Sequence, residues 1–275
     1  MTKILSEKQI KNFYRDGFVF PINLFSEDEA LELRKELEAA EKKWPETFKG
    51  AGRNNAHLCL KCLDRIVHNE CLLDSVEDLI GSNILNYGTV LFIKEPNDPG
   101  FVSWHQDAKY MGLEPHIGIT VWIALSESNL ENGCMQMIPG SQDVIRDHND
   151  TFGKNNILTR GQEVKGMDEK LAVSIQLRPG QASFHSARVV HRSQPNKSKD
   201  RRIGFVIQPF MPPNVVQTKS RVAAQLVRGT DSYNNFDKAS RPKEDMNKSD
   251  IEFRDKVNAI WAEHLYEGAE KRRDF

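Results

Sequence analysis

The stretch "HIGITVWIAL" (residues 116–125) decides the fold class, because its apolar side chains alternate along the chain. Ile117, Ile119, Val121, Ile123 and Leu125 fall on one face of an extended segment. Alternation with a period of two is typical of a β-strand that has one face in a hydrophobic core. The stretch therefore predicts a core strand.

Further short β-rich segments lie on both sides of this strand, and Pro, Gly and Asn residues separate them. Strands divided by turns, without helical patterns between them, favour an antiparallel barrel or jelly roll over a parallel βαβ sheet. We predict a mainly β core over about residues 83–212. Its segments are "NILNYGTVLFIKEP" (83–96), "CMQMIPGS" (134–141), "LAVSIQLRPGQASFHSARVVHRSQPN" (171–196) and "RRIGFVIQPF" (201–210).

The two ends of the chain have a helical texture. Ser6 with Gln9, and Ser26 with Glu29, resemble capping boxes at helix starts. Residues 27–43 are rich in strong helix formers, and Pro45 ends the run. We expect residues 1–275 to form one domain, with a helical part at 1–80 and a C-terminal extension at 213–275 that is helical to about residue 267.

Three cysteines cluster in the helical part. Cys59, Cys62 and Cys71, with His57 and His68 nearby, could be interpreted as a zinc site. Zinc sites usually need a second paired motif at a suitable distance, and none follows. The surrounding apolar residues recur at helical spacing, which favours reduced thiols on helices and fits a reducing cytoplasm.

Composition narrows the choice of partners. The formal net charge is −1, which removes the electrostatic reason to expect nucleic acid or an anionic membrane as the main partner. No apolar run approaches the roughly 20 residues of a membrane helix, and the N-terminus lacks the apolar core of a signal peptide. We expect a cytoplasmic protein that acts on a small molecule, and the sequence does not predict its oligomeric state.

Three H-x-[DE] motifs occur, and only one has a context that suits a metal site. His68 falls in a helical pattern, where residues two apart point in different directions. His148 falls in a polar loop. His105 and Asp107, in "VSWHQD", lie between β-rich runs, and residues i and i+2 of a strand point to the same side.

A third ligand and a cation complete the pattern. His191 comes 84 residues after Asp107 (191 − 107), at a strand end, and Arg202 follows on the next strand. Two histidines and one carboxylate on one face of the metal are typical of non-haem Fe(II) oxygenases. An arginine is suited to binding the distal carboxylate of 2-oxoglutarate, and the Ser193 hydroxyl is placed to assist.

With these residues the sequence resembles the phytanoyl-CoA dioxygenase family of Fe(II)/2-oxoglutarate oxygenases. The matching segments span residues 13–210. A stretch at 226–237 is similar to a narrower branch of bacterial 2-aminoethylphosphonate hydroxylases. The segments are "FYRDGFVFPINLFSEDEALELRKELE" (13–38), "VSWHQD" (102–107), "WIALSESNLENGCMQMIPGS" (122–141), "VVHRSQPNKSKDRRIGF" (189–205) and, for the branch, "LVRGTDSYNNFD" (226–237).

The resemblance implies a double-stranded β-helix, which is a cupin-like jelly roll, with flanking helices. It implies Fe(II) bound by His105, Asp107 and His191, with O2 and 2-oxoglutarate as co-substrates. It implies that Arg202 holds 2-oxoglutarate, with help from Ser193, Thr120 and Lys94, although a solvated lysine is an equally good interpretation of Lys94. Related halogenases replace the carboxylate ligand with Ala or Gly, so Asp107 favours hydroxylation.

The substrate is much less defined by the sequence. We expect a small anionic or zwitterionic molecule of the 2-aminoethylphosphonate type, and Met111, in place of an expected aromatic residue, weakens the version with a quaternary ammonium. An amino acid, an acyl thioester or a natural-product intermediate is the alternative, as is a jelly-roll binding protein without catalysis. The loop "GRNNAH" (52–57) could cap the site or begin a helix. Candidate substrate contacts are Tyr110, Arg188, His185 and Asn55.

Overall fold

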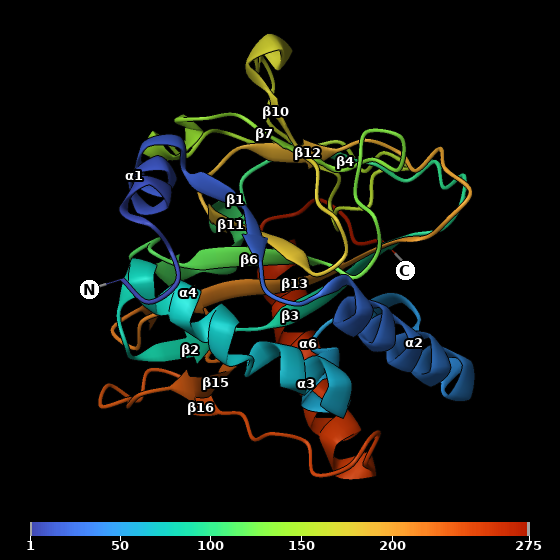
Figure 1. Ribbon diagram of the computed structural model, residues 1–275, viewed down its shortest axis with the longest axis vertical. Helices are drawn as coiled ribbons and strands as arrows, with labels where there is room; N and C mark the ends of the chain where they lie inside the picture. The colour runs from blue at the N-terminus through green and yellow to red at the C-terminus, as the bar shows by residue number, and fades with distance from the viewer. Residues whose placement is uncertain (1, 274–275) are drawn as a thin grey trace.

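The computed structural model describes residues 2–273 and shows two sheets packed face to face (Figure 1). The larger sheet has the order β1-β11-β6-β13-β2-β15-β16, with β3 paired to the first half of β13. The smaller sheet has the order β10-β7-β12-β4. All pairings except that of β15 with β16 are antiparallel, so the predicted jelly roll is confirmed.

The strands of both sheets follow the β-rich segments of the sequence. Those of the larger sheet are β1 (Phe18–Asn23), β2 (Ile84–Asn86), β3 (Thr89–Lys94), β6 (Ile119–Ala124), β11 (Gln181–Ser186), β13 (Arg202–Met211), β15 (Ala223–Arg228) and β16 (Asp237–Lys238). Those of the smaller sheet are β4 (Val102–His105), β7 (Met135–Met137), β10 (Val173–Ile175) and β12 (His191–Ser193). Two short pairs complete the strands: β5 (Leu113–Glu114) with β14 (Val216–Gln217), and β8 (Asn149–Asp150) with β9 (Gln162–Glu163).

Helices cover the outer face of the larger sheet (Figure 1). Both predicted capping boxes are present, at Ser6 and Ser26. The α-helices are α1 (Glu7–Asp16), α2 (Glu27–Lys43), α3 (Lys61–Val67), α4 (Glu70–Ile80), α5 (Ala108–Met111) and α6 (Lys248–Tyr266). The 3₁₀ helices are η1 (Pro45–Phe48), η2 (Gly50–Arg53), η3 (Ala56–Leu58), η4 (Ser141–Asp143) and η5 (Glu169–Leu171).

Strand β13 separates the helical side of the fold from the space between the sheets. Ile203, Phe205 and Ile207 pack into the core shared with the helices. Arg202 and Val206, on the opposite face, line a cavity between the two sheets. This alternation follows from the period of two along a strand, and it explains how a strand can present a guanidinium to the interior.

The C-terminal extension returns to this cavity. Helix α6 runs behind the larger sheet (Figure 1), and Arg273, which follows it, donates to the carbonyls of Asn156 and Leu158 in a loop beside the cavity. Trp261, Leu265 and Tyr266 of α6 line the cavity. The extension therefore forms part of the cavity wall.

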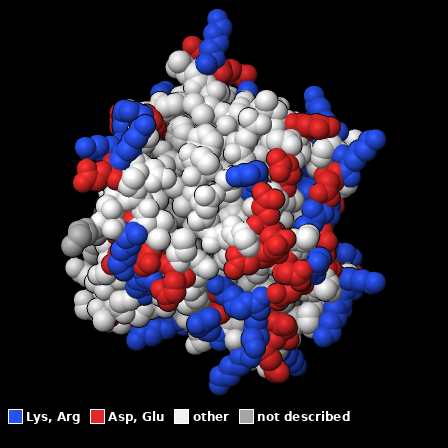
Figure 2. Space-filling model, in the orientation of Figure 1, with Lys and Arg blue, Asp and Glu red and all other residues white. Residues whose placement is uncertain are grey.

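The surface shows mixed charges on the face drawn in Figure 2, where acidic and basic side chains gather together near α2. Arg201, for example, contacts both Glu41 and Glu95 and so connects α2 to the end of β3. None of the described helices has the length and apolarity required to cross a membrane.

Candidate active site

Three potential metal ligands meet at one end of the cavity. His105 ends β4 and His191 begins β12, and these two residues are register partners. Their rings lie 4.1 Å apart between centroids. Asp107 Oδ1 lies 3.4 Å from His105 Nε2 and 3.9 Å from His191 Nε2. Within the described part of the chain, these three residues are the one group of His, Cys, Asp and Glu with metal-ligand geometry.

The hydrogen bonds of both histidines direct a lone pair toward this meeting point. His105 Nδ1 lies 3.0 Å from the carbonyls of Ser103 and His191, and His191 Nδ1 lies 3.0 Å from the carbonyl of Val189. Carbonyls only accept hydrogen bonds, so each Nδ1 carries the proton and each Nε2 keeps its lone pair. Two lone pairs and a carboxylate then face one another, which is an arrangement that fits a metal cation.

The protonation states of His191 and Asp107 also fit a metal site. Burial lowers the pKa of His191 to about 3, so its ring is neutral at neutral pH. Burial opposes ionisation of Asp107, but the adjacent His191 and His105 still lower the pKa of its carboxyl below the usual value. The centre therefore offers neutral imidazole nitrogen and an ionised carboxylate.

Asp107 reaches the centre by a route that strand alternation does not describe. Strand β4 ends at His105, and Asp107 has helical dihedral angles (φ −61°, ψ −42°) at the start of α5. Its Oδ2 accepts a hydrogen bond from Thr120 Oγ1 at 3.3 Å. The prediction that His105 and Asp107 aim at one point agrees with the structure, but its stated reason was wrong, because a helical turn supplies the geometry.

Two buried basic side chains lie side by side at the deep end of the cavity: Arg202 lines the cavity, and Lys94 lies behind the lining residue Ser193. Arg202 is 1% exposed and Lys94 is fully buried, and they are register partners on β13 and β3. Lys94 Nζ donates to Ser193 Oγ at 2.8 Å and to the carbonyl of Gln194. Arg202 Nη1 donates to the carbonyl of Gly133 at 2.5 Å, and its Nε is buried without a partner among the described residues.

Neither cation has a carboxylate partner among the described residues. Burial, and then the neighbouring Arg202, lower the pKa of Lys94 to about 6. Burial lowers the pKa of Arg202 to about 10, so this side chain stays charged at neutral pH. Arg202 is therefore a buried charge without a counterion among the described residues, which is costly, and it suits an anion that enters the cavity.

Thr120 and His185 form a third register pair, on β6 and β11, beside the metal ligands. The Thr120 hydroxyl donates to Asp107, so Thr120 directly contacts one of the three potential metal ligands. His185 is 1% exposed, and its ring centroid is 5.1 Å from that of His191. Both its ring nitrogens lack a hydrogen-bond partner among the described residues. Burial lowers the pKa of His185 to about 4.

The other expected substrate contacts divide into two groups. Tyr110 lines the cavity, as does His185. Arg188 does not line it, because it lies in a turn after β11 and its Nη2 donates to the carbonyl of Asp143 at 2.8 Å. Asn55 does not line it either. Its left-handed backbone (φ 53°) turns the side chain toward Asn258 Oδ1 and the backbone N–H of Thr89.

The sequence did not predict the residues that hold the backbone between the metal ligands. His148, dismissed as a loop residue, accepts the backbone N–H of Gln106 at 2.9 Å through its Nε2. Its ring meets Tyr110 edge-to-face at 5.3 Å. The Gln106 side chain donates to the carbonyls of Val144 and Arg188. These contacts hold the backbone between His105 and Asp107.

The cysteine cluster lies apart from this site. Cys59 and Cys62 are buried and Cys71 is partly buried, and all three are free thiols. Burial raises the pKa of Cys59 to about 11 and of Cys62 to about 12. Within the described residues these thiols form no group with metal-ligand geometry, which agrees with the helical interpretation over a zinc site.

Comparison with known proteins points to the same chemistry. The family model described as "Phytanoyl-CoA dioxygenase (PhyH)" matches residues 13–204. A probable alpha-ketoglutarate-dependent hypophosphite dioxygenase of Stutzerimonas stutzeri is 30% identical over 169 residues, which are 59% of this chain and 58% of that protein. A phytanoyl-CoA dioxygenase domain-containing protein 1 of Danio rerio is 32% identical over 49% of this chain and 47% of its own length. The matches thus span about half the length of these relatives.

Solved structures extend the likeness to nearly the whole chain. The apo structure of ThoJ, a non-heme monooxygenase, matches with a TM-score of 0.84 at 29% identity, over 96% of this chain and 100% of that one. CytC3 with Fe(II) and alpha-ketoglutarate matches with a TM-score of 0.69 at 22% identity, over 90% and 97%, and at this identity shows the fold alone. From the family match and the fold we conclude that this chain belongs to the phytanoyl-CoA dioxygenase family.

Proposed function

We propose that the chain is an Fe(II)- and 2-oxoglutarate-dependent hydroxylase of a small molecule. The observation that carries the proposal is one cavity lined both by the three potential metal ligands and by Arg202, a buried cation without a carboxylate partner among the described residues. In the balanced reaction, one oxygen atom of O2 is inserted into a substrate C–H bond and the other is incorporated into succinate. 2-Oxoglutarate supplies two electrons and loses CO2. Iron, when bound, supplies the oxygen activation.

His105 Nε2, Asp107 Oδ1 and His191 Nε2 are the proposed iron ligands. A set of two histidines and one carboxylate leaves positions open for a chelating co-substrate and O2. Because Asp107 supplies a carboxylate ligand, no coordination position of the metal is left vacant for a halide. This residue supports hydroxylation over halogenation.

Arg202, Lys94 and Ser193 are the proposed partners of the distal carboxylate of 2-oxoglutarate. The guanidinium provides paired donors that match a carboxylate. Lys94 Nζ donates to Ser193 Oγ in the structure and so places a basic group behind this hydroxyl. Thr120 is assigned a different task, which is to orient Asp107 through its hydroxyl.

The cavity favours a substrate larger than 2-aminoethylphosphonate. Its volume is about 690 Å³, and sites of roughly 300–1,000 Å³ hold drug-sized molecules. Asp98 and Asp107 are the only carboxylates among the described lining residues. Asp98 already accepts backbone N–H groups of Glu95 and Gly100. A zwitterion's ammonium would therefore lack a ready partner, and we favour a natural-product intermediate or acyl thioester.

The test is succinate release by the protein with Fe(II), 2-oxoglutarate and O2. The substrate panel contains 2-aminoethylphosphonate, hypophosphite, amino acids, acyl thioesters and larger natural products. We expect a member of the larger classes to raise succinate release together with its own hydroxylation. If 2-oxoglutarate is neither bound nor consumed under any condition, the alternative of a jelly-roll binding protein without catalysis is the better interpretation.

A further inference from the structure

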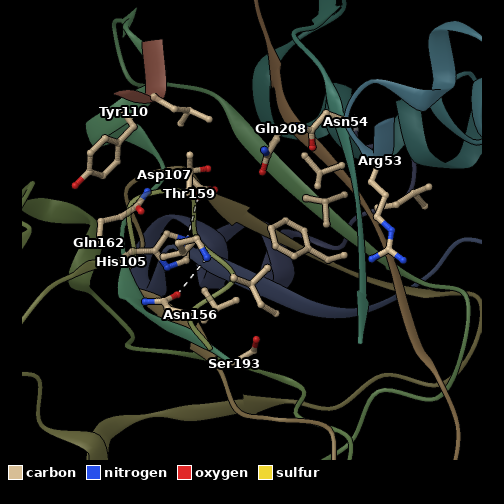
Figure 3. A pocket seen from close by; sticks show the side chains of 18 of the residues that line it. Arg53, Asn54, His105, Asp107, Tyr110, Asn156, Thr159, Gln162, Ser193 and Gln208 are labelled. Carbon is tan, nitrogen blue, oxygen red and sulfur yellow. Dashed lines mark hydrogen bonds and ion pairs between the residues drawn. The ribbon is translucent and has the colours of Figure 1, made fainter. Parts of the chain in front are cut away.

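Asn54 and Gln208 each present a side-chain amide to the cavity. Neither amide forms a hydrogen bond with another residue in the described part of the chain, although the backbone groups of both residues do. Both residues are partly exposed, and their amide atoms keep accessible surface. In Figure 3 both amides project into the cavity, whereas the guanidinium of Arg53 is turned away from them. The two amides, which we call the amide pair, are therefore open to a ligand.

The pairing of β3 with its neighbours puts both amides on one face of the sheet. Asn54 forms a β-bridge with Val90, and Val90 is the register partner of Val206 on β13. Residues that lie opposite each other carry their side chains on the same face, and all three residues line the cavity. Gln208 follows Val206 by two residues and shares this face. The backbones that carry the amide pair are thus two strand spacings apart, about 10 Å, which leaves room for one small polar group between the two side chains.

The amide pair lies beside the metal ligands. The register of β13 on β6 places Gln208 opposite Thr120, and neighbouring strands are about 5 Å apart. The Thr120 hydroxyl donates to Asp107. The backbone of Arg202 lies six residues earlier on β13 (208 − 202), roughly 20 Å away along the strand. A group held by the amide pair is therefore close to the proposed metal site and separate from the proposed site of the distal carboxylate of 2-oxoglutarate.

An aromatic wall stands next to the amide pair. The backbone N–H of Gln208 donates to the carbonyl of Gly88 at 2.8 Å, so these two residues lie opposite each other. A Cβ added at Gly88 would come within 2.1 Å of the Trp261 ring, so this ring covers Gly88 where it borders the cavity. Trp261 in turn stacks on Tyr87, with ring centroids 5.1 Å apart. These neighbours favour a ligand that joins a flat polar group to an apolar body.

The polar group that suits this place is neutral. A carboxamide offers N–H donors and a carbonyl acceptor, so the amide pair complements a group that both donates and accepts. The guanidinium of Arg53 is turned away (Figure 3). Asp98, the lining carboxylate other than Asp107 among the described residues, follows the end of β3 that pairs with Arg202. An anionic or cationic group would therefore lack an opposite charge beside the amide pair, whereas an amide finds both partners it needs.

We propose that the amide pair binds a neutral carboxamide or peptide-type amide group of the primary substrate. The N–H of that group donates to one side-chain carbonyl, and its carbonyl accepts from the other side chain's NH2. The carbon chain attached to the bound amide then lies within reach of the end of the cavity with His105 and Asp107. The inference rests on the proposed function for the reaction itself. It goes further by naming the substrate class, which is molecules that carry an amide, and the residues that select it.

The test uses four probes with one apolar body: 4-phenylbutanamide, methyl 4-phenylbutanoate, 4-phenylbutanoate and 4-phenylbutylamine. The ester keeps the carbonyl and lacks the N–H, and the last two probes are charged. Calorimetric titration is done on the full chain under anaerobic conditions, once with Fe(II) and saturating 2-oxoglutarate and once without either. We expect the amide to bind about fivefold or more tightly than each of the other three probes, the range for one or two neutral hydrogen bonds.

Variants locate the effect. Gln208→Met and Asn54→Leu each remove one amide at similar size, and each should remove most of the amide preference while the affinity for the ester stays nearly unchanged. Asn54→Asp should shift the preference toward the amine by about fivefold, because a carboxylate accepts from an ammonium. Gln142→Met is the matched control, since the partly buried Gln142 amide donates to the carbonyls of Tyr14 and Arg15 on α1. Thermal unfolding checks that each variant is folded.

The failures of this inference and of the proposed function are distinguishable. If the visible charge-transfer band of the Fe(II)–2-oxoglutarate complex forms but the amide binds no more tightly than the other probes, the amide pair inference is overturned alone. The same holds if folded Gln208→Met and Asn54→Leu both keep the full amide preference. If the band does not form at all, the proposed function is overturned, and the titration without Fe(II) and 2-oxoglutarate still decides whether the amide pair selects an amide.

Discussion

The two ends of the cavity are built in different ways. The inner end, with His105, His191 and Arg202, is built mainly from paired strands, and each side chain is held by register partners and backbone carbonyls. The outer end, with Arg53 and Trp261, is built from a 3₁₀ segment and a C-terminal helix. The difference teaches that the potential metal ligands and Arg202 are fixed mainly by the sheets, whereas peripheral segments supply the far wall of the cavity, as is common where loops surround a rigid fold.

The largest effect should come from removing the carboxylate of the inner end. Asp107→Ala deletes one proposed metal ligand and leaves two histidines, and we expect substrate-dependent succinate release to fall by more than about a hundredfold, the upper range for losing even a supporting metal-site residue. The measurement is succinate per minute with excess Fe(II). Retained activity in this variant would sink the triad assignment.

The next effect concerns the cation at the deep end. Arg202→Gln removes the buried guanidinium, and we expect the Kd for 2-oxoglutarate to rise by about a hundredfold, from the 2–5 kcal/mol typical of a buried charge partner. Arg201→Gln is the matched control, because Arg201, the residue next to Arg202, binds Glu41 and Glu95 on the outside. Equal losses in both variants would contradict a specific role for Arg202.

Lys94 should make the binding of 2-oxoglutarate depend on pH. Burial and the adjacent Arg202 lower the pKa of Lys94 to about 6. A bound carboxylate favours the charged lysine and raises this pKa. Affinity is therefore highest below about pH 6 and falls as the pH rises above it, by up to about tenfold per unit until the pKa of the bound state is reached.

The check on Lys94 is an anaerobic titration of 2-oxoglutarate between about pH 5.5 and 8.5, a range that brackets this pKa. Lys94→Met should bind more weakly and lose the pH dependence. A flat Kd in the wild-type protein, or the same slope in the variant, would show that Lys94 does not contact the co-substrate.

The smallest effect should come from His148, which holds the backbone between the metal ligands His105 and Asp107. His148→Ala leaves the backbone N–H of Gln106 without its acceptor, and we expect Fe(II) to bind about tenfold more weakly, at the low end for supporting residues of metal sites. His68→Ala, at the C-cap of α3 and paired with Asp64, is the control. Unchanged iron affinity in His148→Ala would show that Gln106 holds its position without this contact.

Sequence reasoning succeeded where side-chain direction follows from local periodicity. Arg202 opposite Ile203 and Phe205 was predictable because a strand alternates its faces. The helix starts at Ser6 and Ser26 were predictable because a capping box is a local motif. The spacing of His191 from Asp107 became meaningful only in combination with Arg202 and the family resemblance.

The same reasoning failed where direction depends on irregular backbone. Arg188 lies in a turn and Asn55 has a left-handed backbone, so proximity in sequence did not indicate where their side chains point. His148 lies 41 residues beyond Asp107 (148 − 107) and joins the site only through tertiary packing. Trp261 carries no local signal at all, because its partners Tyr87 and Gly88 are distant in sequence.

The central claim is that the inner end holds Fe(II) and 2-oxoglutarate together. The most direct measurement is anaerobic titration of the full chain with Fe(II) and then with 2-oxoglutarate, followed by visible absorption and calorimetry. The account predicts a charge-transfer band that saturates at one 2-oxoglutarate per chain, is absent in Asp107→Ala, and is strongly weakened in Arg202→Gln. A folded wild-type protein that binds Fe(II) but develops no such band, with no heat of 2-oxoglutarate binding, would contradict the account.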